Sequence, residues 1–379
     1  MALKQPYFPT GIVTGLAFCD REAEREYLRR RLDQNAHVVL MSPRRYGKSS
    51  LIAQFTQEQN IPFASIDLLP ATSSKYVKNA ILDGVTQLLD LMPLKPKKLM
   101  QKALGHFANM NPVIELTAFH QKIILKPDEK THEETILKAL MNLDAVAKEL
   151  NQELIFVMDE FQQIAELPDA HSLEASIRHA VERSKNIFYI FSGSNRTLLE
   201  EMFKNKKRPL YHLCDEMKLN RISKALYADF IQKAANKAWK MEISDSAIEL
   251  ILQLTGCHPY YVNRLCRMLW DFDAPPNGEQ VKKTWGKYIE SQKMDWVSEM
   301  IGELSINQRL VLAGLAQAPE KEPSGKDFAI KLEMPSSSIQ RTINGLVKND
   351  LVYKDSNGFY HVLNPVIKSI FENDQYFGL

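Results

Sequence analysis

A small basic loop between residues 42 and 49 carries the residue types that bind a phosphate chain. Residues 37–41 are mostly apolar and rich in valine, which predicts a short buried strand, and residues 48–55 have a helical pattern. A loop that joins a strand to a helix presents backbone N–H groups at the helix N-terminus, where the helix dipole favours an anion. Lys48 would then reach the β- and γ-phosphates of ATP, and the Ser49 hydroxyl would bind Mg²⁺.

The loop matches the phosphate-binding pattern G-x-x-x-x-G-K-[ST] except at its first position, where Ser42 replaces glycine. If that position requires a positive φ, serine carries a steric cost there and weakens the site. The alternative interpretation is an ordinary turn, in which Gly47 caps the loop and Lys48 lies in solvent. The candidate nucleotide contacts from this segment are Ser42, Pro43, Arg44, Arg45, Tyr46, Gly47, Lys48, Ser49 and Ser50.

Two acids, Asp159 and Glu160, follow the apolar run at residues 154–158. An uninterrupted run of this kind predicts a central parallel strand, and such strands place ligand groups at their carboxyl ends. Asp159 would hold Mg²⁺ together with Ser49, and Glu160 would orient and deprotonate the water that attacks the γ-phosphate. Helix capping by Asp159 is the structural alternative. The two motifs in this order favour ATP binding and hydrolysis.

Two more polar residues lie where they could serve the same chemistry. Residues 186–192 predict another buried strand, and Asn195 follows it, so that its amide could hydrogen-bond the γ-phosphate or the attacking water. Asparagine is equally common in plain turns. Arg208 ends a basic cluster at residues 204–208 and is a candidate to reach the nucleotide of a neighbouring subunit, although a solvated loop is the favoured interpretation.

The elements that position these residues alternate between helix and strand. Asp20 is expected to cap a helix with an apolar stripe of Tyr27, Leu28 and Leu32. A strand is predicted at residues 61–68, and helices at 75–92, 131–151 and 173–184. Residues 93–127 are rich in proline and lysine and are expected to form a basic insertion with a solvated face. This order predicts an α/β core with a three-layer parallel sheet.

The C-terminal segment predicts a winged helix-turn-helix. Helices are expected at residues 306–316, 325–332 and 335–348, the last with Ser336 as N-cap, followed by a β-hairpin around Asn357-Gly358. Its exposed recognition face would be Ser337, Gln340, Arg341, Asn344 and Lys348. Residues 301–379 contain eight Lys/Arg and nine Asp/Glu, a net charge of −1, which does not favour DNA.

Composition excludes several classes of protein. The chain has 379 residues, enough for two or three domains, and its 45% hydrophobic and 25% charged residues are ordinary for a globular protein. A net charge of +2 does not by itself imply a nucleic-acid partner. Neither a membrane span nor a signal peptide is recognisable, so a cytoplasmic location is expected. The four cysteines show no CxxC spacing and are expected to be free thiols.

Four segments together resemble the archaeal-type ATPases of the AAA+ superfamily, near its signal-transducing (STAND) branch and the origin-recognition ATPases. Residues 18–22 resemble that family's F-x-x-R-E box, and residues 42–49 its G-P-R-R-x-G-K-[ST] loop. Residues 156–162 are similar to its D-E-F/I-Q strand, and residues 255–261 to its T-G-G-H-P-Y-Y turn. The resemblance covers nearly the whole chain.

The resemblance implies a P-loop NTPase core at residues 1–216, a helical lid at 217–298 and a winged helix domain at 299–379. It adds Phe18, Arg21, His258 and Pro259 to the residues expected near ATP or ADP. Cys257 replaces a family glycine, and His212-Leu213 stand where many relatives have Gly-Arg. The second departure removes a catalytic arginine and predicts slow turnover.

The leading hypothesis is a Mg²⁺-dependent ATPase that acts as a nucleotide-controlled switch and signals to a protein partner through its winged helix. ATP between core and lid would set their angle. Two alternatives stay open: an ATP-gated DNA-binding protein of the origin-recognition type, and a pseudo-ATPase that binds nucleotide without turnover. A nucleotide-dependent oligomer is compatible with each of them, because the family's architecture does not determine assembly.

Overall fold

The chain forms two units in the computed structural model, which describes residues 7–92, 97–116, 121–126, 131–296, 302–355 and 357–373. One unit consists of residues 21–44 and 48–220 and is called the α/β unit below; the other, the helical unit, consists of residues 1–20, 45–47 and 221–379. The chain passes from one unit to the other near residue 220. The further predicted division at 298/299 stays a prediction.

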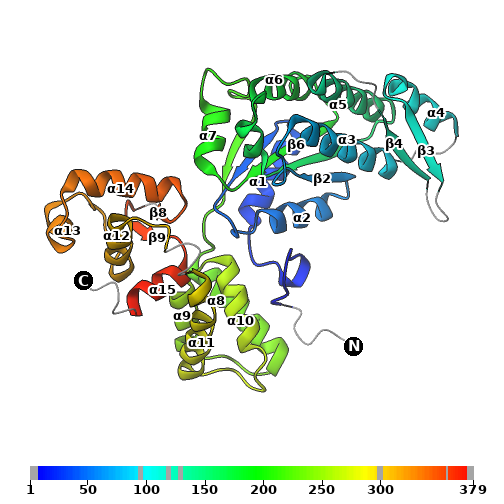
Figure 1. The fold of residues 1–379 in the computed structure, drawn as a ribbon. Coiled ribbons are helices and arrows are strands. Elements are labelled where there is room, and N and C mark those ends of the chain that lie inside the picture. Colours follow the sequence, from blue (N-terminus) through cyan, green and yellow to red (C-terminus); the bar gives the residue numbers. More distant parts are fainter. Residues whose placement is uncertain are drawn as a thin grey trace. The chain divides into compact units, whose positions relative to one another are not determined.

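The α/β unit is built on a five-stranded parallel sheet in the order β2-β5-β6-β1-β7 (Figure 1). Its strands are β1 (Val38–Met41), β2 (Phe63–Asp67), β5 (Leu154–Asp159), β6 (Ile187–Gly193) and β7 (Asp215–Lys218). All neighbouring strands are parallel, so β1 and β5, which precede the basic loop and the two acids, end at the same edge with β6 between them. The predicted α/β fold with a parallel core is confirmed.

Alternate residues of the central strands are buried on opposite faces of the sheet. Phe156 and Met158 of β5 join the core that contains residues of α3 (Ser74–Leu91), α5 (His132–Glu149) and α6 (Ala170–Val181). Phe188 of β6 lies on the other face, where its ring contacts Phe55 of α2 (Lys48–Gln59) at a centroid distance of 6.4 Å. Because the side-chain period of a strand is two, helices cover both faces and the unit has three layers.

The predicted insertion contains a small substructure of its own. It comprises α4 (Lys97–His106), a 3₁₀ turn at Ala108–Met110, and an antiparallel pair of β3 (Pro112–Leu116) and β4 (Gln121–Leu125). Ile123 is buried in the main core, and Lys102 Nζ lies 3.3 Å from Glu149 on α5. The insertion is therefore packed onto the core. Lys95 and the other residues at 93–96, 117–120 and 127–130 lie outside the described residues.

The helical unit contains the predicted three C-terminal helices and hairpin. Its earlier helices are α8 (Lys224–Trp239), α9 (Asp245–Thr255), α10 (Pro259–Leu269) and α11 (Gly278–Trp296). They are followed by α12 (Ile306–Gln317), α13 (Lys326–Lys331), α14 (Ser336–Lys348), β8 (Val352–Lys354), β9 (Tyr360–Val362) and α15 (Pro365–Asn373). The last helix was not predicted. Among the described helices, none has the length and apolar character needed to cross a membrane.

A single hydrophobic cluster runs through the helical unit. It contains Leu265 of α10, Val311 of α12 and Ile367 of α15, together with Phe8 near the N-terminus. Trp285 Nε1 of α11 donates a hydrogen bond of 3.1 Å to Ser369 Oγ of α15. The C-terminal helices therefore share their core with α8–α11. All four cysteines are free, as predicted.

Two predicted helix caps are wrong. Asp20 has a φ of 60° and lies one residue before the N-cap of α1 (Glu22–Asp33), which is Arg21 with a φ of 68° and no side-chain cap. Ser336 lies inside α14, whose N-cap is Pro335. An N-cap normally has an extended backbone, and two successive left-handed residues cannot be recognised from residue type alone.

Candidate functional site

The basic loop leaves the sheet at the end of β1. Ser42 is fully buried, and its N–H donates to Gly193 O at 3.4 Å, which extends the pairing of β1 with β6. The left-handed positions of the loop are Arg45, with a φ of 66°, and Gly47, with a φ of 90°. Ser42 is not left-handed, so the steric cost expected from its replacement of glycine does not arise.

Lys48 is the first residue of α2 and is 7% exposed. Its Nζ donates to Ser42 O at 3.4 Å, so the ammonium lies back along the loop. Apart from Gly47 itself and its two chain neighbours, no described residue has a heavy atom within 4 Å of the position that a Cβ on Gly47 would take. The loop therefore borders open space beside a lysine, which is the arrangement that a phosphate requires. Pro43 and Ser50 are buried, whereas Arg44 is exposed.

Asp159, at the carboxyl end of β5, is held by three neighbours. Oδ1 accepts from Ser192 Oγ at 2.5 Å and from Glu160 N at 3.0 Å. Oδ2 accepts from Ser49 Oγ at 3.4 Å. The two predicted metal ligands are thus brought together from β5 and α2. Their oxygen atoms are the type of ligand that Mg²⁺ prefers.

Glu160 follows in a left-handed conformation with a φ of 50°, which is uncommon for a residue with a side chain. Its Oε2 accepts from Gln162 Nε2 at 2.6 Å, from Ser194 Oγ at 2.7 Å and from Ser194 N at 3.3 Å. Burial alone would raise the pKa of Glu160, but these hydrogen bonds and the charge of Lys48 outweigh it and hold the pKa below its ordinary value. Glu160 is therefore an ionised carboxylate near neutral pH.

The end of β6 supplies the donors that hold both acids. Ser192 and Ser194 are buried and bond Asp159 and Glu160 respectively. Arg44 Nε of the loop donates to Ser194 Oγ at 3.4 Å. Asn195 is the N-cap of α7 (Arg196–Lys204), and its Oδ1 accepts from Leu198 N at 3.1 Å. The Asn195 side-chain oxygen is committed to the cap, and its contact with a nucleotide stays a prediction.

Sequence reasoning missed Ser192, Ser194 and Gln162 as parts of this cluster. The two serines are separated by one residue at the end of a predicted strand, so their side chains share one face. This spacing points to the acids only if β6 lies next to β5, and the structure shows that the two strands pair.

A second group of predicted site residues lies within the helical unit. Arg45 packs its guanidinium over the Tyr260 ring at 4.5 Å, and the Tyr46 ring contacts His258 at a centroid distance of 4.9 Å. His258 precedes Pro259, the first residue of α10. Burial, and next the nearby Arg221, lower the pKa of His258 to about 3, so its imidazole is neutral.

Arg221 connects several parts of the helical unit. It donates to Tyr46 Oη at 3.2 Å, to Gly256 O at 2.6 Å and to Leu363 O at 2.6 Å. Its guanidinium also covers the Tyr353 ring of β8 at 4.6 Å. Sequence reasoning did not single out this residue.

Phe18 and Arg21 belong to different units. Arg21 is 5% exposed and donates to Glu24 Oε1 at 2.6 Å and to Asn220 O at 2.7 Å. These bonds give Arg21 a structural role. The structure does not bring Arg21 into the cluster around Glu160, and the predicted nucleotide contacts of Phe18 and Arg21 stay predictions.

Two positions at which this chain lacks a family glycine, His212 and Cys257, have a left-handed backbone. His212 and Cys257, which replace family glycines, each have a φ of 54°. Glycine is the residue that adopts this conformation without strain, which explains the family pattern. Leu213, in place of the arginine, is partly buried against the α/β core.

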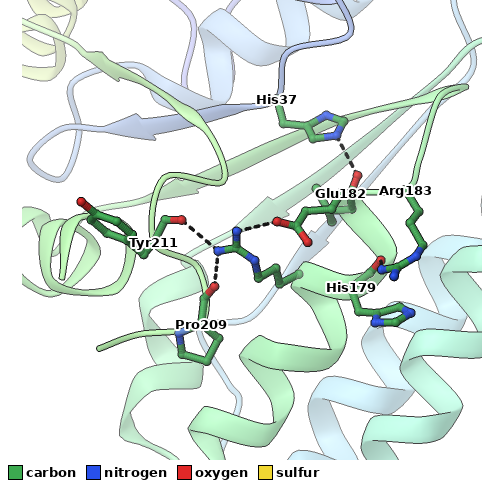
Figure 2. A network of polar contacts seen from close by, with 8 residues as sticks. His37, His179, Glu182, Arg183, Pro209 and Tyr211 are labelled. Atoms are coloured by element: carbon green, nitrogen blue, oxygen red, sulfur yellow. Dashed lines mark hydrogen bonds and ion pairs between the residues drawn. The ribbon is translucent and has the colours of Figure 1, made fainter. Parts of the chain in front are cut away.

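The interpretation of Arg208 as part of a solvated loop is wrong. Arg208 forms an ion pair with Glu174 of α6, a side chain that is fully buried. The same loop is fixed by Arg178, which donates to the carbonyl oxygens of Pro209 and Tyr211. Figure 2 shows Pro209 and Tyr211 in this network of polar contacts.

The cluster in the α/β unit fits a triphosphate and one divalent cation. It offers an open loop at a helix N-terminus, a nearly buried lysine, a hydroxyl bonded to a carboxylate, and a second carboxylate that is ionised. Among the described residues, no group of three or more His, Cys, Asp or Glu side chains could hold a metal ion. The pair of oxygen ligands from Ser49 and Asp159 suits Mg²⁺, because this ion usually takes one or two protein ligands and completes its shell with phosphate oxygens and water.

Comparisons with known proteins agree with this geometry. Residues 18–265 match the model of a family described as the ATPase domain predominantly from Archaea. The fold is similar to the Walker-type ATPase PABY2304 of Pyrococcus abyssi, with a TM-score of 0.69 and 18% identity over 97% of this chain and 99% of that one.

A second solved structure with a similar fold is the Aeropyrum pernix ORC2 protein with ADPNP and ADP, with a TM-score of 0.52 and 14% identity over 93% of this chain and 94% of that one. No curated protein sequence matches the chain. The family match extends from Phe18 to Leu265 and therefore includes the loop, the acids and the sheet. The chain therefore belongs to the ATPase domain family found predominantly in Archaea.

Proposed function

We propose that this chain is a Mg²⁺-dependent ATPase in which nucleotide controls a switch. The observation that carries the proposal is the hydrogen bond between Ser49 Oγ and Asp159 Oδ2 at 3.4 Å, with Lys48 close enough to lower the pKa of Glu160. The phosphate loop and both acids thus form one cluster. Lys48 and the loop N–H groups would bind the phosphates, and Ser49 and Asp159 would hold Mg²⁺.

The proposed reaction is hydrolysis of ATP to ADP and phosphate. Glu160 orients a water molecule and accepts one of its protons while the water oxygen bonds to the γ-phosphorus. The bond from that phosphorus to the β,γ-bridging oxygen breaks, and its electron pair leaves with ADP. When bound, Mg²⁺ would neutralise the charge on the β- and γ-phosphates. Slow turnover is proposed because Leu213 occupies the position of a family arginine and packs on the core.

The switch would act through the C-terminal segment of the helical unit, as in the STAND branch. We propose that α12–α14, β8 and β9 form a winged helix that contacts a protein partner. The five residues of its predicted recognition face, Ser337, Gln340, Arg341, Asn344 and Lys348, are all exposed on α14. Changes in assembly should accompany the switch, and light scattering of the protein with ADP and with a nonhydrolysable ATP analogue measures them.

The exposed face of α14 also supports DNA binding as a second candidate function. The net charge of −1 over residues 301–379 argues for a protein partner instead. Retention on duplex DNA at low salt, with and without ATP, separates the two functions. Salt-dependent retention that requires Arg341 would favour DNA.

Nucleotide binding is tested with Lys48→Ala. Loss of the ammonium should weaken ATP at least about tenfold, since a charge-assisted contact to phosphate is worth about 1.5–3 kcal/mol. Calorimetric titration with MgATP measures the affinity. Lys75→Ala, which removes an exposed lysine of α3, serves as the matched control and should bind like the wild type. Equal affinity of the Lys48→Ala and wild-type proteins would contradict the proposal.

A further inference from the structure

Gln162 is a buried amide beside the proposed catalytic carboxylate. It lies in the first turn after β5, at Phe161–Glu166, and is 2% exposed. Its Nε2 donates to Glu160 Oε2 at 2.6 Å. An ionised carboxylate accepts hydrogen bonds and cannot donate them. The amide must therefore present its nitrogen, which is the donor, to Glu160. The orientation of the side chain is therefore determined by Glu160.

In the part of the chain that the structure describes, the oxygen of the Gln162 amide makes no hydrogen bond that would stabilise the fold. Gln162 Oε1 is buried and has no hydrogen-bond partner among the described residues. It lies against Gly193, where an added Cβ would stand 1.9 Å from it. A buried polar atom without a partner lowers stability, and an apolar side chain of similar size would avoid that cost. Fold stability alone does not account for a glutamine here.

The contacts of Glu160 show what this glutamine does. Gln162 and Ser194 together direct three donors to Oε2, whereas Oε1 accepts no hydrogen bond from the described residues. The two sides of the carboxylate are thus different: one oxygen accepts three hydrogen bonds, and the other accepts none from the described residues. A carboxylate held in this way presents one defined lone-pair direction to a water molecule.

We propose that Gln162 is a positioning residue for Glu160, and that its buried amide fixes the carboxylate so that Oε1 meets the attacking water. This inference rests on the proposed ATPase reaction. The Gln162 amide donates to Glu160 Oε2, and it would act on the reaction only through that carboxylate. Ser194, at the end of β6, donates to the same oxygen, so both residues position the Glu160 carboxylate.

The experiment uses the full chain, single-turnover release of labelled phosphate, and MgATP affinity. Gln162→Met keeps the length of the side chain and removes the donor. It should lower the rate of hydrolysis about 10–100-fold, the usual range for a misplaced catalytic group. ATP affinity should stay at its wild-type value, and the unfolding midpoint should not fall below that of the wild type. Gln163→Met, at the neighbouring and partly exposed position, is the matched control and should hydrolyse ATP like the wild type.

A double-variant cycle separates positioning from a structural role. In a Glu160→Gln background, Gln162→Met should cause no further loss of rate, because its target is gone. An equal loss in both backgrounds, a wild-type rate in Gln162→Met, or a parallel loss of affinity and stability would each overturn the inference. A wild-type chain that binds ATP without turnover would also overturn it and leave nucleotide binding intact. A chain that binds no ATP would refute the proposed function itself.

Discussion

The two ends of the central sheet both bury polar side chains, yet only one has the features of a reactive site. At the amino end, His37 Nε2 bonds Val181 O at 3.1 Å, and its Nδ1 accepts from Tyr189 N at 3.3 Å (Figure 2 shows the first bond). Nearby, Asp144 Oδ1 accepts from Ser184 Oγ at 2.8 Å and from Asn186 N at 2.9 Å. These groups mostly satisfy backbone atoms of fixed elements.

At the carboxyl end, side chains meet side chains instead. The side chains of α2 and of the carboxyl ends of β5 and β6 lie together beside the basic loop. They are those of Lys48, Ser49, Asp159, Glu160 and Ser194. The comparison shows that burial of polar residues does not by itself identify a site. Convergence of charged groups from several elements next to open space does so, because only that arrangement leaves room for a charged ligand.

The largest expected effect is on the rate of ATP hydrolysis, when a carboxylate at the carboxyl end of the sheet is replaced. Glu160→Gln should lower the rate of ATP hydrolysis by about 10²–10⁴-fold, the usual contribution of a general base. The free energy of unfolding should change little by comparison, because the amide nearly preserves the shape of the side chain and its oxygen can still accept hydrogen bonds. Phosphate release and urea unfolding are the measurements. Unchanged phosphate release at background level in both proteins would indicate a pseudo-ATPase.

The next effect concerns the ion pair between Arg208 and Glu174. Arg208→Ala leaves a fully buried carboxylate without its partner and should lower the free energy of unfolding by about 3–5 kcal/mol. Urea unfolding at pH 8 is the appropriate measurement, since burial raises the pKa of Glu174 to about 7. Replacing both residues with methionine should recover most of the loss. If the double variant is no more stable than Arg208→Ala, the pair does not act as a unit.

Asp144 tests whether the amino end is purely structural. Asp144→Ala removes the carboxylate that accepts hydrogen bonds from Ser184, Lys185 and Asn186, and it should cost about 1.5–3 kcal/mol. ATP affinity of the folded protein should not change. Asp83→Ala, at an exposed position of α3, is the control for removal of an aspartate. A loss of ATP affinity in Asp144→Ala would contradict a purely structural role for the amino end of the sheet.

The smallest effect is a pH dependence from His37. Burial lowers its pKa below the ordinary value, whereas the unfolded chain keeps that value and takes up a proton more readily. The neutral imidazole therefore favours the folded state above about pH 6.5, and this contribution is lost as the pH falls below that value. Urea unfolding at pH 7.5 and pH 5.5 should show a weaker pH dependence in His37→Asn than in the wild type.

His179→Gln is the matched control for that comparison, because His179 is exposed on α6. Its pH dependence should equal that of the wild type. Glu174 acts in the opposite direction, since its raised pKa favours folding at low pH and that contribution is lost as the pH rises toward 7. Each variant is therefore compared with the wild type at the same two pH values.

The sequence by itself determined the two strands that carry the candidate site and the residue types at their ends. A valine-rich run before Gly47-Lys48-Ser49 and an apolar run before Asp159-Glu160 predicted two strands with phosphate-binding and acidic ends, and both strands are present. Local residue patterns suffice there, because strand burial and turn chemistry depend on neighbours along the chain.

Only the tertiary structure decided how those residues are held. The pairing of β6 with β5 brings Ser192 and Ser194 to the acids, and the fold places Gln162 Nε2 within 2.6 Å of Glu160 Oε2. The sequence predicted neither the left-handed backbone at Asp20 and Arg21 nor the ion pair of Arg208 with the buried Glu174. Each of these depends on contacts between residues that are distant in the chain, or on backbone angles that residue type does not specify.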